Sequence, residues 1–229
     1  MAIGIRSSTT AKTRPVVAIL LIVAGLAGAR VPALGGTMTA DEIAGRIAAS
    51  PLKPEIGAII DLDAPRPSRA TADDYRIEPP GSRPFASDGA GGMFHLLPDG
   101  RILLIDSEGS FGVVASGFDE FVATATGLPS WRDALRFVGE PDLGRARAAW
   151  NGFVRRSGLD KELDGPWPYG SKGFSAPTPA VARRAIRSQW GIPASSDPFA
   201  ALYHAVNRLS GDVSVSWQDD PLLLFGRNP

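Results

Sequence analysis

The sequence predicts an α+β protein with a small antiparallel β-meander sheet packed against helices, followed by additional C-terminal helices and a short C-terminal strand. Three observations lead to this prediction. Short apolar runs alternate with turn signals between residues 83 and 115, as in consecutive strands joined by tight turns. Helical spacing then begins at Phe118 and continues through Phe121, Val122 and Ala125. The strands are also clustered rather than alternating with helices, which argues against a parallel doubly wound sheet.

Residues 1–37 form an apolar and basic N-terminal extension with four basic residues and no acidic one. The apolar run at 16–29 follows Lys12 and Arg14 and is typical of a secretory signal. It is shorter than the roughly 20 residues that cross a bilayer, so a membrane anchor is the weaker interpretation. Alternatively, translation starts at Met38, because Thr39 and Glu42 form a capping-box pattern that opens the first amphipathic helix.

The segment from residue 38 to 82 is expected to contain one helix, one strand and a long connection. The helix covers residues 39–50 and ends at Pro51. The short apolar run at 55–60 reads as an edge strand. Prolines and scattered charges at 61–82 indicate a surface connection, in which residues 75–77 touch the sheet.

The meander itself is predicted as strands at 93–97, 101–106 and 111–115. In the second of these, apolar side chains occupy both faces, so it is expected to be the middle strand and to be covered on both sides. Four glycines are expected to form the structural turns that separate the strands: Gly91, Gly92, Gly100 and Gly109.

Helices follow the meander. Ser116 and Ser130 each precede an aspartate by three residues, which places helix starts at Gly117 and Trp131. Another helix is expected at 141–157, completing a domain of residues 38–157. Residues 158–229 are interpreted as a C-terminal helical extension, with a loop to 177, helices at 179–190 and from 198, and a strand at 213–217.

Composition narrows the function classes. The chain has no cysteine, which excludes disulfides, thiol catalysis and thiolate metal sites. Its net charge is zero, but residues 38–142 hold 17 acidic and 9 basic side chains. Nucleic-acid binding needs Lys and Arg opposite the phosphates, so an acidic body argues against direct nucleic-acid contact and favours a basic partner.

No residue pattern predicts a catalytic, cofactor-binding or metal site. The two histidines, His95 and His204, lack the spacing of metal ligands and are expected to be structural or surface residues. The glycine-rich run at 88–92 leads into a strand rather than a helix, so it reads as a turn and not as a phosphate loop. Asp106 and Glu108 resemble a carboxylate pair for acid–base chemistry, but such residues more often cap turns.

One tryptophan stands apart from the others. Trp167 lies in a loop rich in glycine, proline and aromatic residues, whereas the other four fall at apolar positions of expected helices and strands. It either covers the core or is exposed as an anchor for a binding partner. Both alternatives stay open from the sequence.

Four short motifs resemble the SUKH superfamily, which includes fungal cell-wall-synthesis regulators and many bacterial immunity proteins. They are Pro84-Phe-Ala86 with Asp88 and Gly91-Gly-Met-Phe94, then Arg101-Ile-Leu-Leu104 with Ser107-Glu-Gly109, then residues 112–115 with Phe118 and Glu120, and finally Gly127-Leu-Pro-Ser-Trp131. The resemblance covers about 55 of the 229 residues well and extends loosely into 141–157.

The resemblance implies an α+β domain that acts as a non-enzymatic protein-binding module, commonly a cytoplasmic immunity protein that neutralises a toxin. A basic toxin domain fits the acidic charge of residues 38–142. The alternative is an exported or membrane-tethered protein, for which a hydrolase that uses carboxylates is the candidate activity. The candidate partner-binding surface comprises Asp88, Asp99, Asp106, Glu108, Asp119, Glu120 and Trp167.

Overall fold

The computed structural model describes residues 38–63, 75–168 and 170–227. The alternatives for the N-terminal extension, and most of the expected connection at 61–82, therefore lie outside the described residues. The described residues belong to one compact unit. Its class is α+β, as predicted.

The larger sheet has five strands in the order β2-β3-β4-β5-β8. Strands β2 (Arg83–Ser87), β3 (Met93–Leu96), β4 (Ile102–Ile105) and β5 (Ser110–Ala115) form an antiparallel meander, and β8 (Leu223–Leu224) runs parallel to β5. The three predicted strands correspond to β3, β4 and β5. The predicted middle strand, β4, lies at the centre of the order and is buried on both faces.

A smaller antiparallel sheet contains β1 (Tyr75–Glu78), β6 (Ser214–Trp217) and β7 (Asp220–Pro221). The predicted strand at 213–217 is therefore confirmed as β6. The sequence placed residues 75–77 against the meander, whereas β1 hydrogen-bonds to β6 in this second sheet. A strand separated from β6 by more than 130 residues is not visible in a local pattern.

The helices mostly begin and end where their caps indicate. Thr39 and Glu42 form the predicted capping box, Thr178 caps α7 and Asp197 caps α8. In chain order the helices are α1 (Ala40–Ala48), α2 (Lys53–Ile60), α3 (Phe118–Ala125), α4 (Trp131–Ala134), α5 (Leu143–Ser157), α6 (Lys161–Asp164), α7 (Pro179–Gln189) and α8 (Pro198–Leu209), with a short 3₁₀ turn at Leu135–Phe137 after α4.

The expected edge strand at 55–60 is wrong, because these residues form helix α2. Pro54 lies in the first turn, where its missing N–H removes no helical hydrogen bond. Ile56, Ile59 and Ile60 are all buried, at the i, i+3, i+4 spacing of one helix face. Burial of three isoleucines against the core outweighs their preference for strands.

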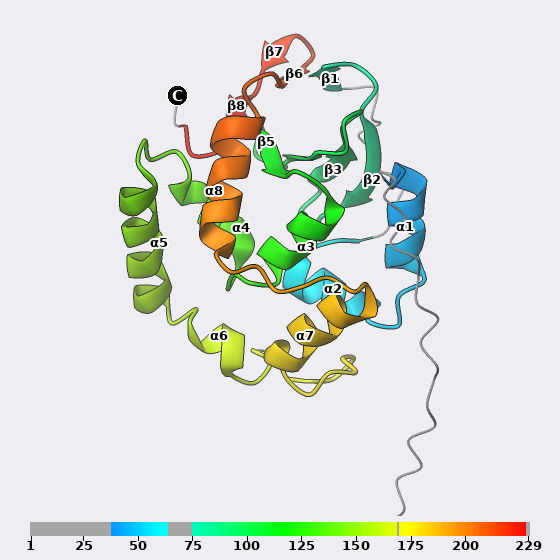
Figure 1. Cartoon of the computed structure of the whole chain (residues 1–229), viewed down its shortest axis with the longest axis vertical. Coiled ribbons are helices and arrows are strands. Elements are labelled where there is room, and N and C mark those ends of the chain that lie inside the picture. Colours follow the sequence, from blue (N-terminus) through cyan, green and yellow to red (C-terminus); the bar gives the residue numbers. More distant parts are fainter. Residues whose placement is uncertain (1–37, 64–74, 169, 228–229) are drawn as a thin grey trace, which may run out of the picture. The chain divides into compact units, whose positions relative to one another are not determined.

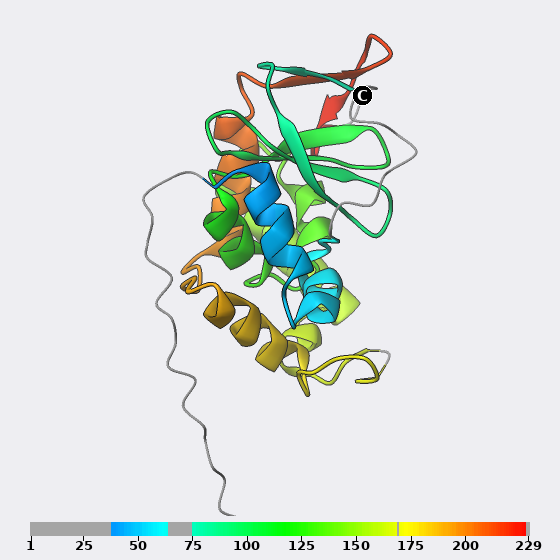
Figure 2. The same cartoon turned by 90° about the vertical axis from the view of Figure 1, so that its right-hand side faces the viewer.

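Two layers of apolar side chains hold these elements together. In Figure 2 the small sheet lies above the five-stranded sheet, and most of the helices lie below it. The core between the two sheets includes Leu103 and Ile105 of β4, and the core on the helix side includes Ile102 and Leu104. The alternation of β4 side chains therefore contributes to both cores.

The ranges 38–157 and 158–229 share the helix-side core. Phe94 and Phe121 come from the first range, whereas Ile186 and Leu202 come from the second, and all four belong to one cluster of buried residues. Helix α8 packs against β5 in Figure 1, and β8 extends the sheet beyond β5. The extension expected at 158–229 is thus built into the same body as the meander.

Within the described ranges, no helix has both the length and the apolar character needed to cross a membrane.

Candidate functional site

The acidic residues singled out in the sequence are divided between two opposite ends of the five-stranded sheet. Antiparallel pairing puts the β2–β3 and β4–β5 turns at one end, where Met93 lies opposite Ile105. The β3–β4 turn and the entry to α3 lie at the other end, where Leu96 is paired with Ile102. Asp88, Asp106 and Glu108 therefore lie at the first end, and Asp99, Asp119 and Glu120 at the second. The expectation that these six carboxylates share one acidic surface is therefore wrong.

Asp88 is buried rather than exposed, which corrects its assignment to the partner-binding surface. Its side chain accepts hydrogen bonds from the backbone N–H groups of Gly92, at 2.6 Å, and Ala90, at 2.9 Å. Arg132 Nη2 lies 2.6 Å from Asp88 Oδ2, so the two side chains form an ion pair. Asp88 thus fixes the β2–β3 turn and ties it to α4.

Two carboxylates at this end were missed in the sequence. Asp61 follows α2 and accepts a hydrogen bond from Gly89 N–H at 3.1 Å, and Asp63 bridges to Ser87 through the backbone. Burial raises the pKa of Asp61, and the negative charges of Asp88 and Asp63 act in the same direction. In the sequence, the only sign of a role for Asp61 and Asp63 was that they follow an apolar run. Their position at this end of the sheet depends on residues 55–60 folding as a helix, which the sequence pattern did not predict.

We call this group the acidic end: Asp61, Asp63, Asp88, Asp106 and Glu108. Asp106 accepts hydrogen bonds from the backbone of Glu108, at 3.0 Å, and Ser110, at 2.7 Å, whereas the Glu108 side chain is exposed. Its counter-ions among the described residues include Arg132 and Lys53, whose Nζ lies 3.9 Å from Asp63 Oδ1.

At the opposite end most carboxylates already have partners. Asp99 pairs with Arg101 at 2.6 Å, and the same guanidinium binds both oxygens of Asp212, at 2.6 and 2.8 Å. Glu120 accepts the Ser116 N–H at 2.7 Å, so it closes the entry to α3. Asp119 is exposed at the first turn of the same helix.

The turn glycines are placed as the sequence predicted. Gly91, Gly100 and Gly109 have φ values of 101°, 91° and 86°, in the region that favours glycine. Gly92 is required for a different reason: a Cβ there would lie 2.8 Å from the carbonyl oxygen of Ile105 and 2.5 Å from Asp88 Oδ2. Close packing of the two turns at the acidic end therefore depends on Gly92.

Neither histidine belongs to a metal site among the described residues, where no group of three or more His, Cys, Asp or Glu side chains could hold an ion. His95 is 1% exposed, and both of its ring nitrogens lack hydrogen-bond partners. Burial lowers the pKa of His95 to about 4. His204 lies half-buried on α8 beside Tyr203. Both fit the expected structural or surface roles.

Trp167 covers the core and is not an exposed anchor. It is 7% exposed, and its Nε1–H donates to the carbonyl oxygen of Ala176 at 2.9 Å. Its ring stacks on Phe174 with centroids 3.9 Å apart. The loop that holds both aromatics is also fixed by Glu55, which accepts the N–H groups of Ser175 and Ala176 at 2.5 and 2.9 Å.

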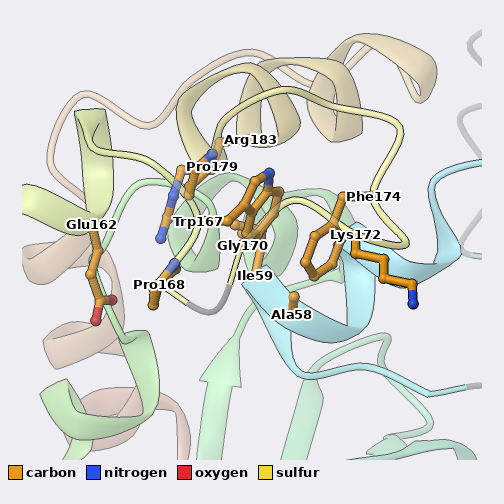
Figure 3. A pocket seen from close by; sticks show the side chains of 10 residues that line it. All are labelled: Ala58, Ile59, Glu162, Trp167, Pro168, Gly170, Lys172, Phe174, Pro179 and Arg183. Atoms are coloured by element: carbon orange, nitrogen blue, oxygen red, sulfur yellow. The ribbon is translucent and has the colours of Figure 1, made fainter.

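A pocket of about 440 Å³ lies between α2, α7 and the α6–α7 loop (Figure 3). This volume falls within the range of small-molecule sites. In Figure 3, Trp167 lies between Arg183 on one side and Phe174 on the other. The pocket is lined by Ala58, Ile59, Glu162, Trp167, Pro168, Gly170, Lys172, Phe174, Pro179 and Arg183.

Arg183 is the unusual residue of this pocket, because it is only 6% exposed. Its Nη1 donates to the carbonyl oxygens of Thr126, at 3.0 Å, and Leu128, at 2.7 Å, just beyond the end of α3. Burial lowers the pKa of Arg183 to about 10, and the negative charge of Glu162 opposes that shift. The side chain therefore remains a cation at neutral pH.

Comparison of the chain with protein-family models, curated proteins and solved structures gives no match in any of the three.

Proposed function

We propose that the protein is a non-enzymatic protein-binding module of the SUKH type, most concretely a toxin-neutralising immunity protein that acts in the cytoplasm. The observation that carries this proposal is the acidic end. Carboxylates from the segment after α2, the β2–β3 turn and the β4–β5 turn converge there, and the counter-ions among the described residues include Lys53 and Arg132. Like charges that lie close together lower stability, and complementary binding of a basic partner offsets this repulsion.

The partner we propose is a basic protein, such as a nuclease toxin domain. Negative potential over the acidic end attracts a positive surface over a distance set by the ionic strength and raises the association rate. The same potential repels phosphates, so a nucleic acid is not the expected ligand. The carboxylate-dependent hydrolase alternative gains no support from the pocket, because a single carboxylate, Glu162, lines it among the described residues.

The first test is co-expression with each toxin candidate encoded beside this gene. We expect one candidate to co-purify with the protein and to lose its toxicity. The complex should weaken as ionic strength rises, since screening shortens the range of the attraction. If no neighbouring candidate binds or is neutralised, the immunity function is rejected, while the fold is unaffected.

A matched pair of charge reversals tests the acidic end itself. Glu108→Lys changes an exposed carboxylate there, and Asp119→Lys changes an exposed carboxylate at the opposite end of the sheet. We expect Glu108→Lys to slow association about tenfold and Asp119→Lys to leave it within about twofold, as measured by surface plasmon resonance. Equal effects of the two reversals would mean that only the overall charge matters.

A further inference from the structure

Arg183 carries hydrogen-bond capacity that the fold does not use. All of its hydrogen bonds to described residues come from Nη1, and they run to the carbonyls of Ala125, Thr126 and Leu128. Its Nε is buried without a partner. A charged donor that is buried without a hydrogen-bond partner lowers stability. Binding to the carbonyls at the end of α3 therefore accounts for Nη1 but not for the other donors of Arg183.

Nη2 of Arg183 makes no hydrogen bond to a described residue, and a guanidinium N–H donates a strong, charge-assisted hydrogen bond to a carboxylate or another planar anion. The other walls of the pocket are largely apolar and aromatic, and include Ile59, Trp167 and Phe174. A ligand that satisfies both parts has an anionic head and an apolar, planar body. Burial of that body supplies affinity, and the charged pair fixes its orientation.

Glu162 restricts the charge of the ligand. It lines the same pocket as Arg183, and its negative charge acts on the guanidinium. Lys172 is exposed, and its ammonium lies on the far side of Phe174 from Arg183 in Figure 3. Glu162 repels any anion that binds Arg183, and it repels a phosphate dianion more strongly than a carboxylate, so the pocket favours a monoanion.

We propose that this pocket binds a small aromatic or otherwise planar monocarboxylate, with its carboxylate on Arg183 and its ring beside Trp167. The proposal does not depend on the immunity function. The pocket shares none of its lining residues with the acidic end.

Isothermal titration calorimetry of the full chain tests the proposal with three acids as probes: benzoate, 2-naphthoate and indole-3-acetate. Each is paired with the neutral alcohol of the same ring system. We expect at least one acid to bind about tenfold more tightly than its alcohol, because a charge-assisted bond to buried Arg183 distinguishes them. If no acid binds more tightly than its alcohol, the proposal is wrong.

Variants locate the binding. Ala58→Phe fills the pocket from an exposed position of α2, and Ala48→Phe places the same ring on an exposed position of α1 that does not line it. We expect the first to abolish acid binding and the second to leave it unchanged. Glu162→Gln removes the opposing charge without touching the α3 cap, and it should tighten acid binding about threefold. Binding that survives Ala58→Phe, or that weakens in Glu162→Gln, overturns the assignment.

Discussion

At the scale of single residues, the described structure places several polar groups where burial changes their behaviour. Asp88 lies in a predicted turn and His95 in a predicted strand. The Asp88 carboxylate accepts two backbone hydrogen bonds and pairs with Arg132, whereas neither ring nitrogen of His95 has a hydrogen-bond partner. The sequence shows the residue type and predicts the strand face, but it does not show which neighbours contact a buried side chain. The environment of each therefore decides its contribution to stability.

His95 should make the protein sensitive to mild acid. Its pKa is about 4 in the folded protein and near 6.5 in the unfolded chain, so the unfolded chain binds more protons between these values. The free energy of unfolding must then fall as pH decreases through this window, by about 2 kcal/mol between pH 8 and pH 5. Urea denaturation at the two pH values measures the loss.

His95→Leu removes the titrating group and two unpaired nitrogens. We expect this variant to be at least as stable as the parent at pH 8 and to gain about 2 kcal/mol on it at pH 5. His204→Leu is the control, because it leaves His95 in place and should keep the parent's loss between the two pH values. An unchanged pH dependence in His95→Leu would show that other groups cause the acid sensitivity.

Asp88 should contribute more to stability than the other turn aspartates. Asp88→Asn keeps an oxygen for the turn N–H groups but leaves Arg132 without its nearest carboxylate, and we expect a loss of about 2 kcal/mol. Asp99→Asn changes a turn aspartate with an exposed ion pair and should lose about 0.5 kcal/mol or less. Equal losses, measured by urea denaturation, would contradict a special role for the buried pair.

At the scale of elements, local patterns predict the strands and helices whose boundaries are marked by turns and caps. The glycine turns define β3, β4 and β5, and Thr39, Thr178 and Asp197 mark helix starts. The pattern failed at α2, because three isoleucines in a short run suit a strand as well as one buried helix face. Only packing against the core separates these alternatives.

The docking of the chain end depends on two glycines that approach each other closely. A Cβ on Gly139 would overlap the backbone of Gly226, just after β8. We expect Gly139→Ala to lower the free energy of unfolding by at least about 2 kcal/mol, because neither backbone can shift without disturbing the β8 pairing. Differential scanning calorimetry would measure the effect.

Gly45→Ala is the matched control for this substitution. Gly45 lies in α1 with open space around the position of a Cβ, so alanine there should raise stability by about 0.5–1 kcal/mol through helix propensity. The two glycine-to-alanine changes should therefore have opposite signs. A neutral Gly139→Ala would mean that the chain end is not docked as described.

At the scale of the whole molecule, residues 158–229 contribute more to the fold than the sequence predicted. They supply α7 and α8 to the helix-side core, β6 to the small sheet, β8 to the large sheet, and most of the pocket. The sequence predicted their helices but neither their partners nor the pocket, because these contacts join segments far apart in the chain. For the same reason, the sequence predicted Asp88, Asp106 and Glu108 of the acidic end but missed Asp61 and Asp63. Helix α2 brings these two residues close to the β2–β3 turn.

Residues 158–229 should therefore be required for folding. Ending the chain after Ser157 removes Ile186, Leu202 and Val206 from the core and exposes their apolar neighbours on the five-stranded sheet and α3. We expect the shortened chain to lose its near-ultraviolet circular dichroism and its cooperative thermal transition.

Within the full chain, Leu202→Ala should lower the free energy of unfolding by about 3 kcal/mol, whereas Leu223→Ala, at an exposed position of β8, should lower it by less than about 1 kcal/mol. A shortened chain that unfolds cooperatively at the parent's Tm would show instead that residues 38–157 fold alone. The contacts that residues 158–229 make in the helix-side core would then not be required for the meander to fold.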